Sequence, residues 1–172
     1  MLTVLLGGAR GGKSSHAVRL ATATGAPVTV IATAEARDDE MRARIASHRS
    51  GRPKEWETIE EPLDLTGALA KPADGATVIV DCLTLWVSNL MEAGADDQAV
   101  EQRARAAASQ AAARDGDTIV VSNEVGFGIV PADPMTRRYR DLLGRVNTIW
   151  CEHAESALLL VAGRALRLEA LS

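Results

Sequence analysis

Short runs of Val, Ile and Leu recur along the chain, and most are uniformly apolar instead of alternating with polar residues. Such runs indicate strands that are buried on both faces, as in a parallel sheet covered by helices. Segments with helical spacing separate them, which favours an α/β fold. We therefore expect three layers, with a mostly parallel sheet of about seven strands and helices on both faces. The expected strands are Thr3–Leu6, Pro27–Ala32, Trp56–Ile59, Thr77–Asp81, Thr118–Ser122, Ala157–Ala162 and Leu166–Leu168.

The expected helices begin and end at residues suited to those places. Asp133 can cap a helix that has Pro134 in its first turn, and Gly51 is a typical helix stop. Residues 93–115 are rich in Ala and Gln, which we interpret as an exposed helix of strong helix formers and not as a linker. With 172 residues, 47% hydrophobic and 24% charged, the chain is predicted to form one domain, residues 1–172. The expected helices are Lys13–Thr24, Asp38–Arg49, Leu83–Glu92, Asp97–Arg114 and Asp133–Glu155.

The first expected strand leads directly into the pattern Gly7-x-x-x-x-Gly12-Lys13-Ser14, the phosphate-loop motif. In such a loop, backbone N–H groups curl around phosphate oxygens, the lysine reaches the β- and γ-phosphates, and the serine hydroxyl ligates Mg²⁺. The helix that follows adds its partial positive charge. A chance cluster of Gly, Lys and Ser is the alternative, but strand, loop and helix occur in the order that the motif requires. We therefore predict that the chain binds a nucleoside triphosphate.

Charge and cysteine content narrow the class of protein. The net charge is −4 and the pI is near 5.4, so the chain has no general attraction for nucleic acid or anionic membranes. We expect no secretory signal, and no apolar stretch is long enough to span a bilayer. Cys82 and Cys151 lack the spacing of metal ligands, so we interpret them as reduced core residues of a cytoplasmic protein.

Ligands of an open parallel sheet bind beyond the carboxyl ends of its strands, so the residues that follow strands are candidates for function. Those residues are Gly7–Ser14, Thr33–Glu35, Glu60, Asp81 and Asn123-Glu124. Asp81 ends an apolar strand, which is where phosphate-loop proteins keep the acid that holds Mg²⁺ directly or through water. The alternative is that Asp81 caps the helix that follows, and the two roles are compatible.

His48 occupies the last turn of an expected helix, on the same stripe as Met41 and Ile45. A lone histidine in such a place commonly caps the helix end or faces solvent. Its neighbours Arg49 and Arg52 favour a second interpretation, because guanidinium groups suit phosphate and an imidazole beside bound phosphate can attack phosphorus. His48 is therefore a candidate covalent nucleophile.

The segment Asn123–Pro131 follows the fifth expected strand and combines a polar pair with two glycines and several aliphatic residues. Its length and aliphatic content favour a shaped loop that holds a partly apolar ligand, and an ordinary strand-to-helix connection is the alternative. His16 and His153 are interpreted as structural. The three tryptophans, Trp56, Trp86 and Trp150, are interpreted as core or subunit contacts.

Several motifs, taken in chain order, resemble the bifunctional adenosylcobinamide kinase/adenosylcobinamide-phosphate guanylyltransferase family. The resemblance covers nearly the whole chain, and its most specific parts are the Asn-Glu-Val-Gly-x-Gly-Ile-Val-Pro block and the His-Arg pair ahead of Gly-Arg-Pro. It implies a P-loop NTPase fold of the RecA-like kind. The motifs are Gly7-Gly8-Ala9-Arg10-Gly11-Gly12-Lys13-Ser14, Ile31-Ala32-Thr33, Asp38-Asp39-Glu40-Met41, Arg44-Ile45, His48-Arg49, Gly51-Arg52-Pro53, Asn123-Glu124-Val125-Gly126-Phe127-Gly128-Ile129-Val130-Pro131 and Arg145-Val146-Asn147.

The resemblance implies two reactions of cobalamin biosynthesis. ATP or GTP phosphorylates the aminopropanol hydroxyl of adenosylcobinamide, and GMP from GTP is then transferred to adenosylcobinamide phosphate, giving adenosyl-GDP-cobinamide. It also implies that His48 carries the GMP and that Ser14 and Asp81 hold Mg²⁺. From the place of the Asn123–Pro131 loop in the expected fold, and not from the resemblance, we expect the corrinoid to meet this loop. The implied nucleotide contacts are Gly8, Ala9, Arg10, Gly11, Gly12, Lys13, Ser14, Ser15, Thr33, Ala34, Glu35, Arg49, Ser50, Gly51, Arg52, Glu60 and Asp81.

The chain departs from the family pattern at two of these positions. Gly11 stands where serine is more usual, and Asp81 stands where relatives can carry the longer glutamate, which would move the Mg²⁺ contact from direct to water-mediated. The family tends to form homo-oligomers, and the resemblance implies a trimer. Two alternatives remain, a small-molecule kinase without a covalent histidine and a nucleotide-binding regulatory switch. The preference for GTP over ATP rests on the resemblance alone.

Overall fold

A computed structural model describes residues 1–170, apart from the side chains of Glu40, Arg44 and Ser47. Within that range the strands number seven and form one sheet, in the order β3-β2-β4-β5-β1-β6-β7. Neighbouring strands are parallel except for the antiparallel pair at the edge, β6 and β7. The expected mostly parallel sheet is confirmed. The strands are β1 (Leu2–Leu6), β2 (Val28–Ala32), β3 (Glu57–Glu60), β4 (Thr77–Asp81), β5 (Thr118–Val121), β6 (Ser156–Val161) and β7 (Arg164–Leu168).

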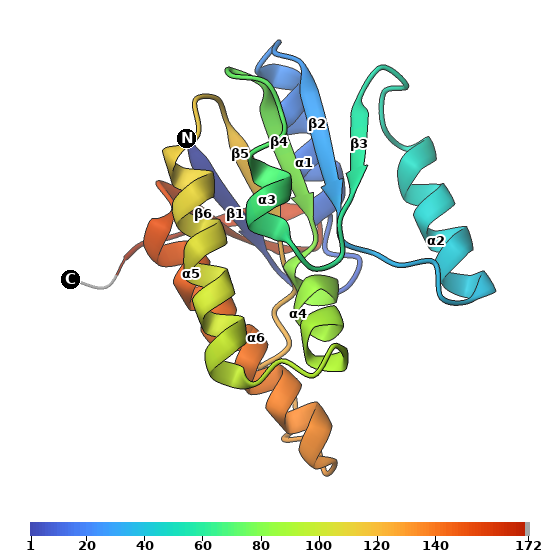
Figure 1. The fold of residues 1–172 in the computed structure, drawn as a ribbon, viewed down its shortest axis with the longest axis vertical. Helices are drawn as coiled ribbons and strands as arrows, with labels where there is room; N and C mark the ends of the chain where they lie inside the picture. The colour runs from blue at the N-terminus through green and yellow to red at the C-terminus, as the bar shows by residue number, and fades with distance from the viewer. Residues whose placement is uncertain (171–172) are drawn as a thin grey trace.

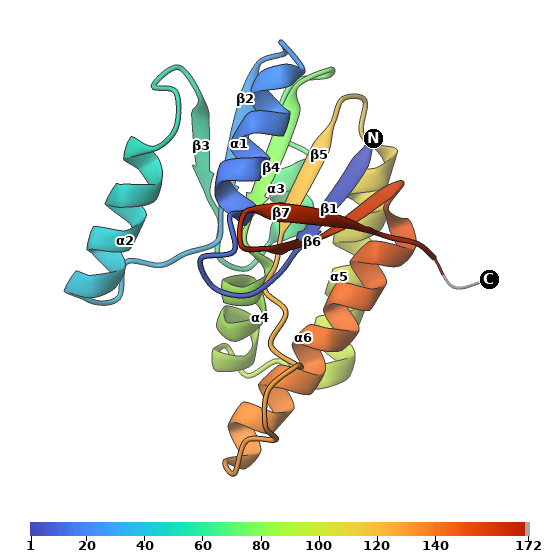
Figure 2. The same ribbon diagram turned by 180° about the vertical axis from the view of Figure 1, so that it is seen from behind.

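Helices cover both faces of the sheet, as expected from the continuous apolar strands. One face carries α1, and the opposite face carries α3, α4, α5 and α6 (Figure 1 and Figure 2). None of the helices within residues 1–170 is both long and apolar enough to cross a membrane. The helices are α1 (Lys13–Ala23), α2 (Asp39–Ser50), α3 (Leu65–Leu69), α4 (Leu83–Glu92), α5 (Asp97–Ala113) and α6 (Pro134–His153).

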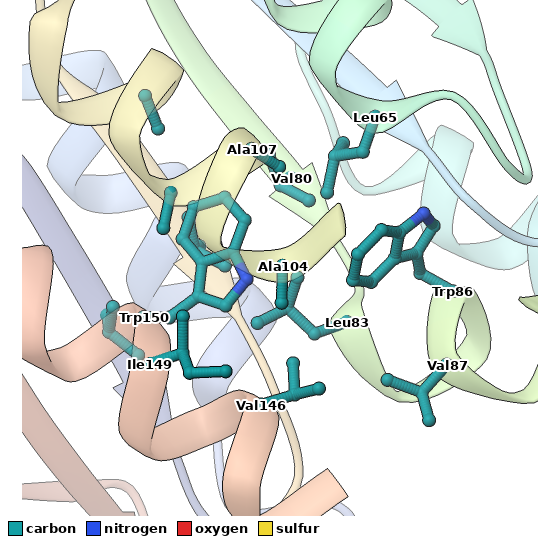
Figure 3. Packing of buried hydrophobic residues seen from close by; sticks show 14 of the residues in the cluster. Leu65, Val80, Leu83, Trp86, Val87, Ala104, Ala107, Val146, Ile149 and Trp150 are labelled. Atoms are coloured by element: carbon teal, nitrogen blue, oxygen red, sulfur yellow. The ribbon is translucent and has the colours of Figure 1, made fainter. Parts of the chain in front are cut away.

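The larger of two apolar clusters lies between the sheet and the four helices α3 to α6. Trp86 of α4 and Trp150 of α6 are both buried in it, with Val80 of the inner strand β4 nearby (Figure 3). The smaller cluster joins the other face of the sheet to Ala17 and Ala21 of α1, which lie four residues apart on one stripe of the helix. This burial fixes β1 and β4 relative to each other, and both of these strands end at the candidate site.

Two expectations about the helices are wrong. The Ala-rich helix α5 is not an exposed helix, because Ala104, Ala107 and Ala108 are fully buried. Figure 3 shows Ala104 and Ala107 among the packed side chains of the neighbouring elements. Small side chains let α5 pack closely on α6, so here alanine serves packing as well as helix propensity. The short helix α3 is absent from the expected elements, since its single turn is too brief to show a helical period. It begins where the Asp64 carboxylate accepts the Gly67 N–H at 3.0 Å.

Helix α2 stands beside the sheet beyond β3 and does not cover either face (Figure 1). None of its described side chains is buried. Its start is capped by Asp38, whose carboxylate accepts the Met41 N–H at 2.7 Å, and it ends at Gly51 as the sequence predicts. The residues that tie α2 to the sheet lie in and just after its last turn, and they belong to the candidate site.

Candidate functional site

The phosphate loop connects β1 to α1 and surrounds the side chain of Lys13. The Lys13 ammonium is buried and donates hydrogen bonds to the carbonyl oxygens of Gly7, at 2.8 Å, and Gly8, at 2.7 Å. Burial lowers the pKa of Lys13, and the nearby Cys82 and Asp81 oppose part of that shift. The loop therefore presents a pre-positioned cation close to the end of β4, as phosphate binding requires.

The turn between β6 and β7 supports the phosphate loop from behind. The Gly163 N–H donates to the Gly11 carbonyl at 3.2 Å. A Cβ at Gly7 would lie 2.3 Å from the Leu160 carbonyl oxygen, and one at Gly11 would lie 2.9 Å from the same oxygen. The close approach of this hairpin explains why glycine stands at position 11, where serine is more usual.

The carboxylate of Asp81, at the end of β4, lies against two side chains that come from α2 and the segment after it. Arg52 donates to Asp81 Oδ2 at 2.7 Å, and His48 Nδ1 lies 3.7 Å from the same oxygen. Arg52 and Asp81 are only 11% and 14% exposed, so their ion pair is largely shielded from water. Burial alone would raise the pKa of Asp81, but His48 and Arg52 together hold it below its ordinary value of 3.8.

His48 lies in the last turn of α2, as predicted, with its side chain 49% exposed. Next to it, Arg49 forms an ion pair with Glu60 at 3.1 Å, which joins the end of α2 to the end of β3. The structure thus brings together candidates that are far apart in the chain. His48, Arg52 and Asp81 converge, and the effect of Asp81 on the pKa of Lys13 connects them to the phosphate loop.

The predicted nucleotide contacts at Thr33–Glu35 have different environments. Thr33 is fully buried, and its hydroxyl donates to the Cys82 carbonyl at 2.7 Å and accepts the Cys82 N–H at 2.9 Å. It therefore holds the ends of β2 and β4 together, which leaves its side chain no path to a ligand in this arrangement. Glu35 is exposed and pairs with Arg37, which also pairs with Glu92 of α4.

A cavity of about 360 Å³ lies beside the end of α2, with strongly cationic walls. Sequence analysis singled out Arg49 and Arg52 but not Lys54, although the three cations occur within six residues. Trp56 packs partly against the smaller apolar cluster and also forms part of the cavity wall. The cavity is lined by Arg49, Arg52, Pro53, Lys54, Trp56 and Thr58.

The loop Asn123–Pro131 begins at the sheet and then runs along α6 toward the far tip of that helix (Figure 2). Its start is anchored, because the Asn123 N–H donates to Thr84 Oγ1 at 2.9 Å and Asn147 Nδ2 donates to the Asn123 carbonyl at 3.0 Å. Beyond that point its apolar side chains face solvent, with Phe127 84% exposed and Ile129 97% exposed. An apolar surface of this kind next to a polar site is typical of a ligand-binding loop.

The remaining histidines and the cysteines have structural surroundings. His16 lies 3.1 Å from Arg19 on α1, and His153 Nδ1 lies 2.9 Å from the Ile149 carbonyl on α6. Both cysteines are free thiols, and burial raises the pKa of each to about 11, so they stay protonated near neutral pH. Cys82 and Cys151 pack against the apolar clusters, which confirms their interpretation as core residues.

Comparison with protein families gives one match that spans nearly the whole chain. The family model described as cobinamide kinase / cobinamide phosphate guanyltransferase matches residues 3–168. The bifunctional adenosylcobalamin biosynthesis protein CobP of Pseudomonas aeruginosa is 43% identical over 170 residues, covering 98% of each chain. The bifunctional protein CobU of Escherichia coli is 38% identical over 184 residues, and that of Salmonella typhimurium is 36% identical over 183 residues. Both alignments cover 98% of this chain and 100% of the relative.

Comparison with solved structures supports the fold. The crystal structure of the RadB recombinase aligns with 92% of this chain and 73% of its own, with a TM-score of 0.51 and 17% sequence identity. At that identity the likeness concerns the fold alone. Together with the strand order and the phosphate loop, it confirms the P-loop NTPase fold of the RecA-like kind.

Proposed function

The chain belongs to the cobinamide kinase / cobinamide phosphate guanyltransferase family, and on that premise we propose that it carries out both reactions. It phosphorylates adenosylcobinamide with ATP or GTP, and it then transfers GMP from GTP to adenosylcobinamide phosphate through a guanylyl-histidine. The observation that carries the proposal is the convergence of His48, Arg52 and Asp81 beside the phosphate-loop lysine. A kinase needs the loop, whereas a nucleotidyltransferase with a covalent intermediate also needs a nucleophile within reach of the same triphosphate.

The covalent step assigns a role to each nitrogen of His48. The Asp81 carboxylate faces Nδ1 and favours a proton there, so Nε2 keeps the lone pair that attacks the α-phosphorus. A P–N bond forms while the bond to the bridging oxygen breaks, and pyrophosphate leaves with that electron pair. An oxygen of the cobinamide phosphate then attacks the same phosphorus, the P–N bond breaks, and neutral His48 is restored.

Ser14 and Asp81 are the residues that would hold Mg²⁺. Both offer hard oxygen donors for the ion. Among the described residues of 1–170, no group of three or more His, Cys, Asp or Glu side chains is placed to hold a metal ion by protein ligands alone. Because Mg²⁺ commonly combines one or two protein oxygens with phosphates and waters, these two side chains fit an ion that arrives with the nucleotide. When bound, Mg²⁺ would neutralise charge on the triphosphate.

The other family contacts fit the same model of the bound substrates. The backbone of Gly8–Ser15 would hold the phosphates, and the cationic cavity at Arg49–Arg52 lies where the nucleotide would extend past His48. The exposed apolar part of the Asn123–Pro131 loop would receive the corrinoid. The homotrimer implied by the resemblance and the cytoplasmic location expected from the cysteines remain predictions.

Labelled GTP tests the transferase half of this proposal. The protein is incubated with Mg²⁺ and GTP labelled at the α-phosphate, and protein-bound label is measured after treatment with base and with acid. A phosphoramidate survives base and is lost in acid, so we expect that pattern in the wild type and no label in His48→Ala. His153→Ala is the matched control, because that histidine lies in the last turn of α6, bonded to its own helix.

Two results would contradict the covalent mechanism. The first is acid-labile label that persists in His48→Ala, which would place the GMP on another residue. The second is the absence of label in the wild type while the γ-phosphate still reaches adenosylcobinamide. That outcome would leave a small-molecule kinase and return His48 to the role of a helix-end residue.

A further inference from the structure

Glu124 lies three residues beyond the end of β5, in the loop beside the phosphate loop, and the mechanism above gives it no role. Its strand, β5, lies between β1, which leads into the phosphate loop, and β4, which ends at Asp81. The Glu124 N–H donates to the Gly7 carbonyl oxygen at 3.2 Å, and the same oxygen accepts from Lys13 Nζ at 2.8 Å. One carbonyl oxygen thus links the backbone of Glu124 to the cation that would hold the phosphates.

We propose that Glu124 is the general base of the kinase step, a proposal that rests on the function assigned above. In that step the acceptor hydroxyl gives its proton to the Glu124 carboxylate while its oxygen bonds to the γ-phosphorus. The bond from that phosphorus to the β–γ bridging oxygen breaks, and the nucleoside diphosphate leaves with the electron pair. A carboxylate commonly fills this role in phosphoryl transfer to a hydroxyl.

A buried polar network fixes the backbone that carries this carboxylate. Asn147 of α6 is almost fully buried, and its Oδ1 accepts from the hydroxyl of the fully buried Ser122 at 2.6 Å. Its Nδ2 donates to the Asn123 carbonyl, and Thr84 of α4 holds the Asn123 N–H. Two helices, α4 and α6, therefore determine where the chain leaves β5, which is the support that a catalytic side chain needs.

Glycine at position 126 keeps the Glu124 carboxylate at the base of its loop. The Gly126 N–H donates to Glu124 Oε1 at 2.5 Å, and a Cβ at Gly126 would lie only 2.8 Å from that oxygen. The exposed apolar residues Phe127 and Ile129 follow directly. If that surface receives the corrinoid ring, the carboxylate lies between the ring and the phosphate loop, where the acceptor hydroxyl has to be.

Three other acids near the carboxyl edge of the sheet are already engaged by arginines. Asp81 pairs with Arg52, which together with His48 lowers the pKa of that carboxyl and makes it a weaker base. Glu60 pairs with Arg49, and Glu35 pairs with Arg37. The Glu124 carboxylate is held instead by a backbone N–H, and among the described side chains of residues 1–170 no cation forms an ion pair with it.

The test separates the two reactions in Glu124→Gln, which keeps the size of the side chain and removes the base. We expect kcat for phosphorylation of adenosylcobinamide to fall by about 10²–10⁴-fold, with little change in KM. The acidic limb of the kinase pH profile should also disappear. Labelling of the protein by GTP, and GMP transfer to ready-made adenosylcobinamide phosphate, should stay within about twofold of the wild type, because neither involves this proton. Glu124→Asp should restore part of the kinase activity.

Glu152→Gln is the matched control, because that residue lies in α6 near the opposite edge of the sheet and pairs with Arg105. Kinase activity of Glu124→Gln within threefold of the wild type would overturn the assignment. So would a parallel loss of phosphorylation and GMP transfer, which would show that Glu124 only shapes the loop. A wild-type protein that does not phosphorylate adenosylcobinamide would instead contradict the proposed function itself, and this inference with it.

Discussion

At the scale of single residues, the pair Arg52–Asp81 carries the electrostatics of the site. Both side chains are largely buried, and burial of an unpaired charge is costly, so neither can be removed without exposing the other to that cost. The pair also holds a segment of chain, because Arg52 follows a helix that covers neither face of the sheet. The positive charge of Arg52 thus has two effects. It holds the end of α2, and with it His48, near Asp81, and it prepares a site for phosphate.

We expect Arg52→Met to destabilise the protein by about 3 kcal/mol at neutral pH, because the buried Asp81 carboxylate loses its cation. The wild-type pKa of Asp81 is lowered, so the stability from this pair is complete above 3.8 and is lost as the pH falls through the folded-state pKa. Denaturant unfolding from about pH 2.5 to pH 8 checks this, and the difference between the two proteins should narrow as the pH falls below about 3.8.

The control for this prediction is Arg49→Met, which breaks the exposed ion pair with Glu60. Exposed pairs contribute about 0–1 kcal/mol, so this variant should be nearly as stable as the wild type. Equal stability of Arg52→Met and Arg49→Met at neutral pH would show that the buried Arg52–Asp81 pair contributes no more to the free energy of unfolding than the exposed Arg49–Glu60 pair.

At the scale of elements, α5 shows how composition can mislead about burial. Its alanines were predicted to face solvent, yet those on one stripe are fully buried against neighbouring helices. The reason is that alanine has high helix propensity and also permits close helix packing, and composition cannot separate these two uses. Only the spacing of positions 100, 104, 107, 108 and 111 indicates a packed face.

We expect Ala107→Leu to destabilise the protein by about 1–3 kcal/mol, since three added carbons have to fit into a packed interior (Figure 3). Ala106→Leu is the matched control, because the adjacent side chain is exposed and its change should stay within about 0.5 kcal/mol. Denaturant unfolding of both variants gives the comparison. Similar stability of the two would mean that the α5 interface can rearrange around a larger side chain.

At the scale of the whole molecule, the candidate site draws on most of the carboxyl edge of the sheet. The phosphate loop, the ends of β3 and β4, the loop after β5 and the turn after β6 all contribute groups to it. A ligand held by so many elements stabilises the folded state in which they meet and has no equivalent site in the unfolded chain.

We therefore expect Mg²⁺ and GTP at about 100 times Kd to stabilise the protein by about 2.7 kcal/mol, which for a domain of this size raises Tm by about 5–11 °C. Thermal unfolding with and without the nucleotide measures this. Lys13→Ala should lose most of the shift, because the buried ammonium that would hold the phosphates is gone. An equal shift in that variant would place the nucleotide elsewhere on the surface.

Much of the fold follows from local patterns in the sequence. Continuous apolar runs predict the parallel sheet, and the caps at Asp133 and Gly51 lie where the structure has them. The expected edge strand Leu166–Leu168 is longer in the structure, because pairing with β6 extends it back to Arg164. Helix α3 escaped prediction because a single turn, capped by Asp64, has no period to detect.

The sequence by itself determined which functional residues occur and where they lie along the chain. A phosphate loop follows the first strand, an acid ends β4, and a histidine precedes two arginines. These follow from short-range patterns that each segment carries alone. Tertiary structure decided which of them meet. The contact of His48 and Arg52 with Asp81 depends on how the segment after α2 returns to the sheet, and the closeness of Gly11 to Leu160 depends on how β6 pairs with β1. Such contacts join residues that are 29 or more positions apart. Local sequence patterns do not specify them, because only the packing of the whole molecule brings these residues together.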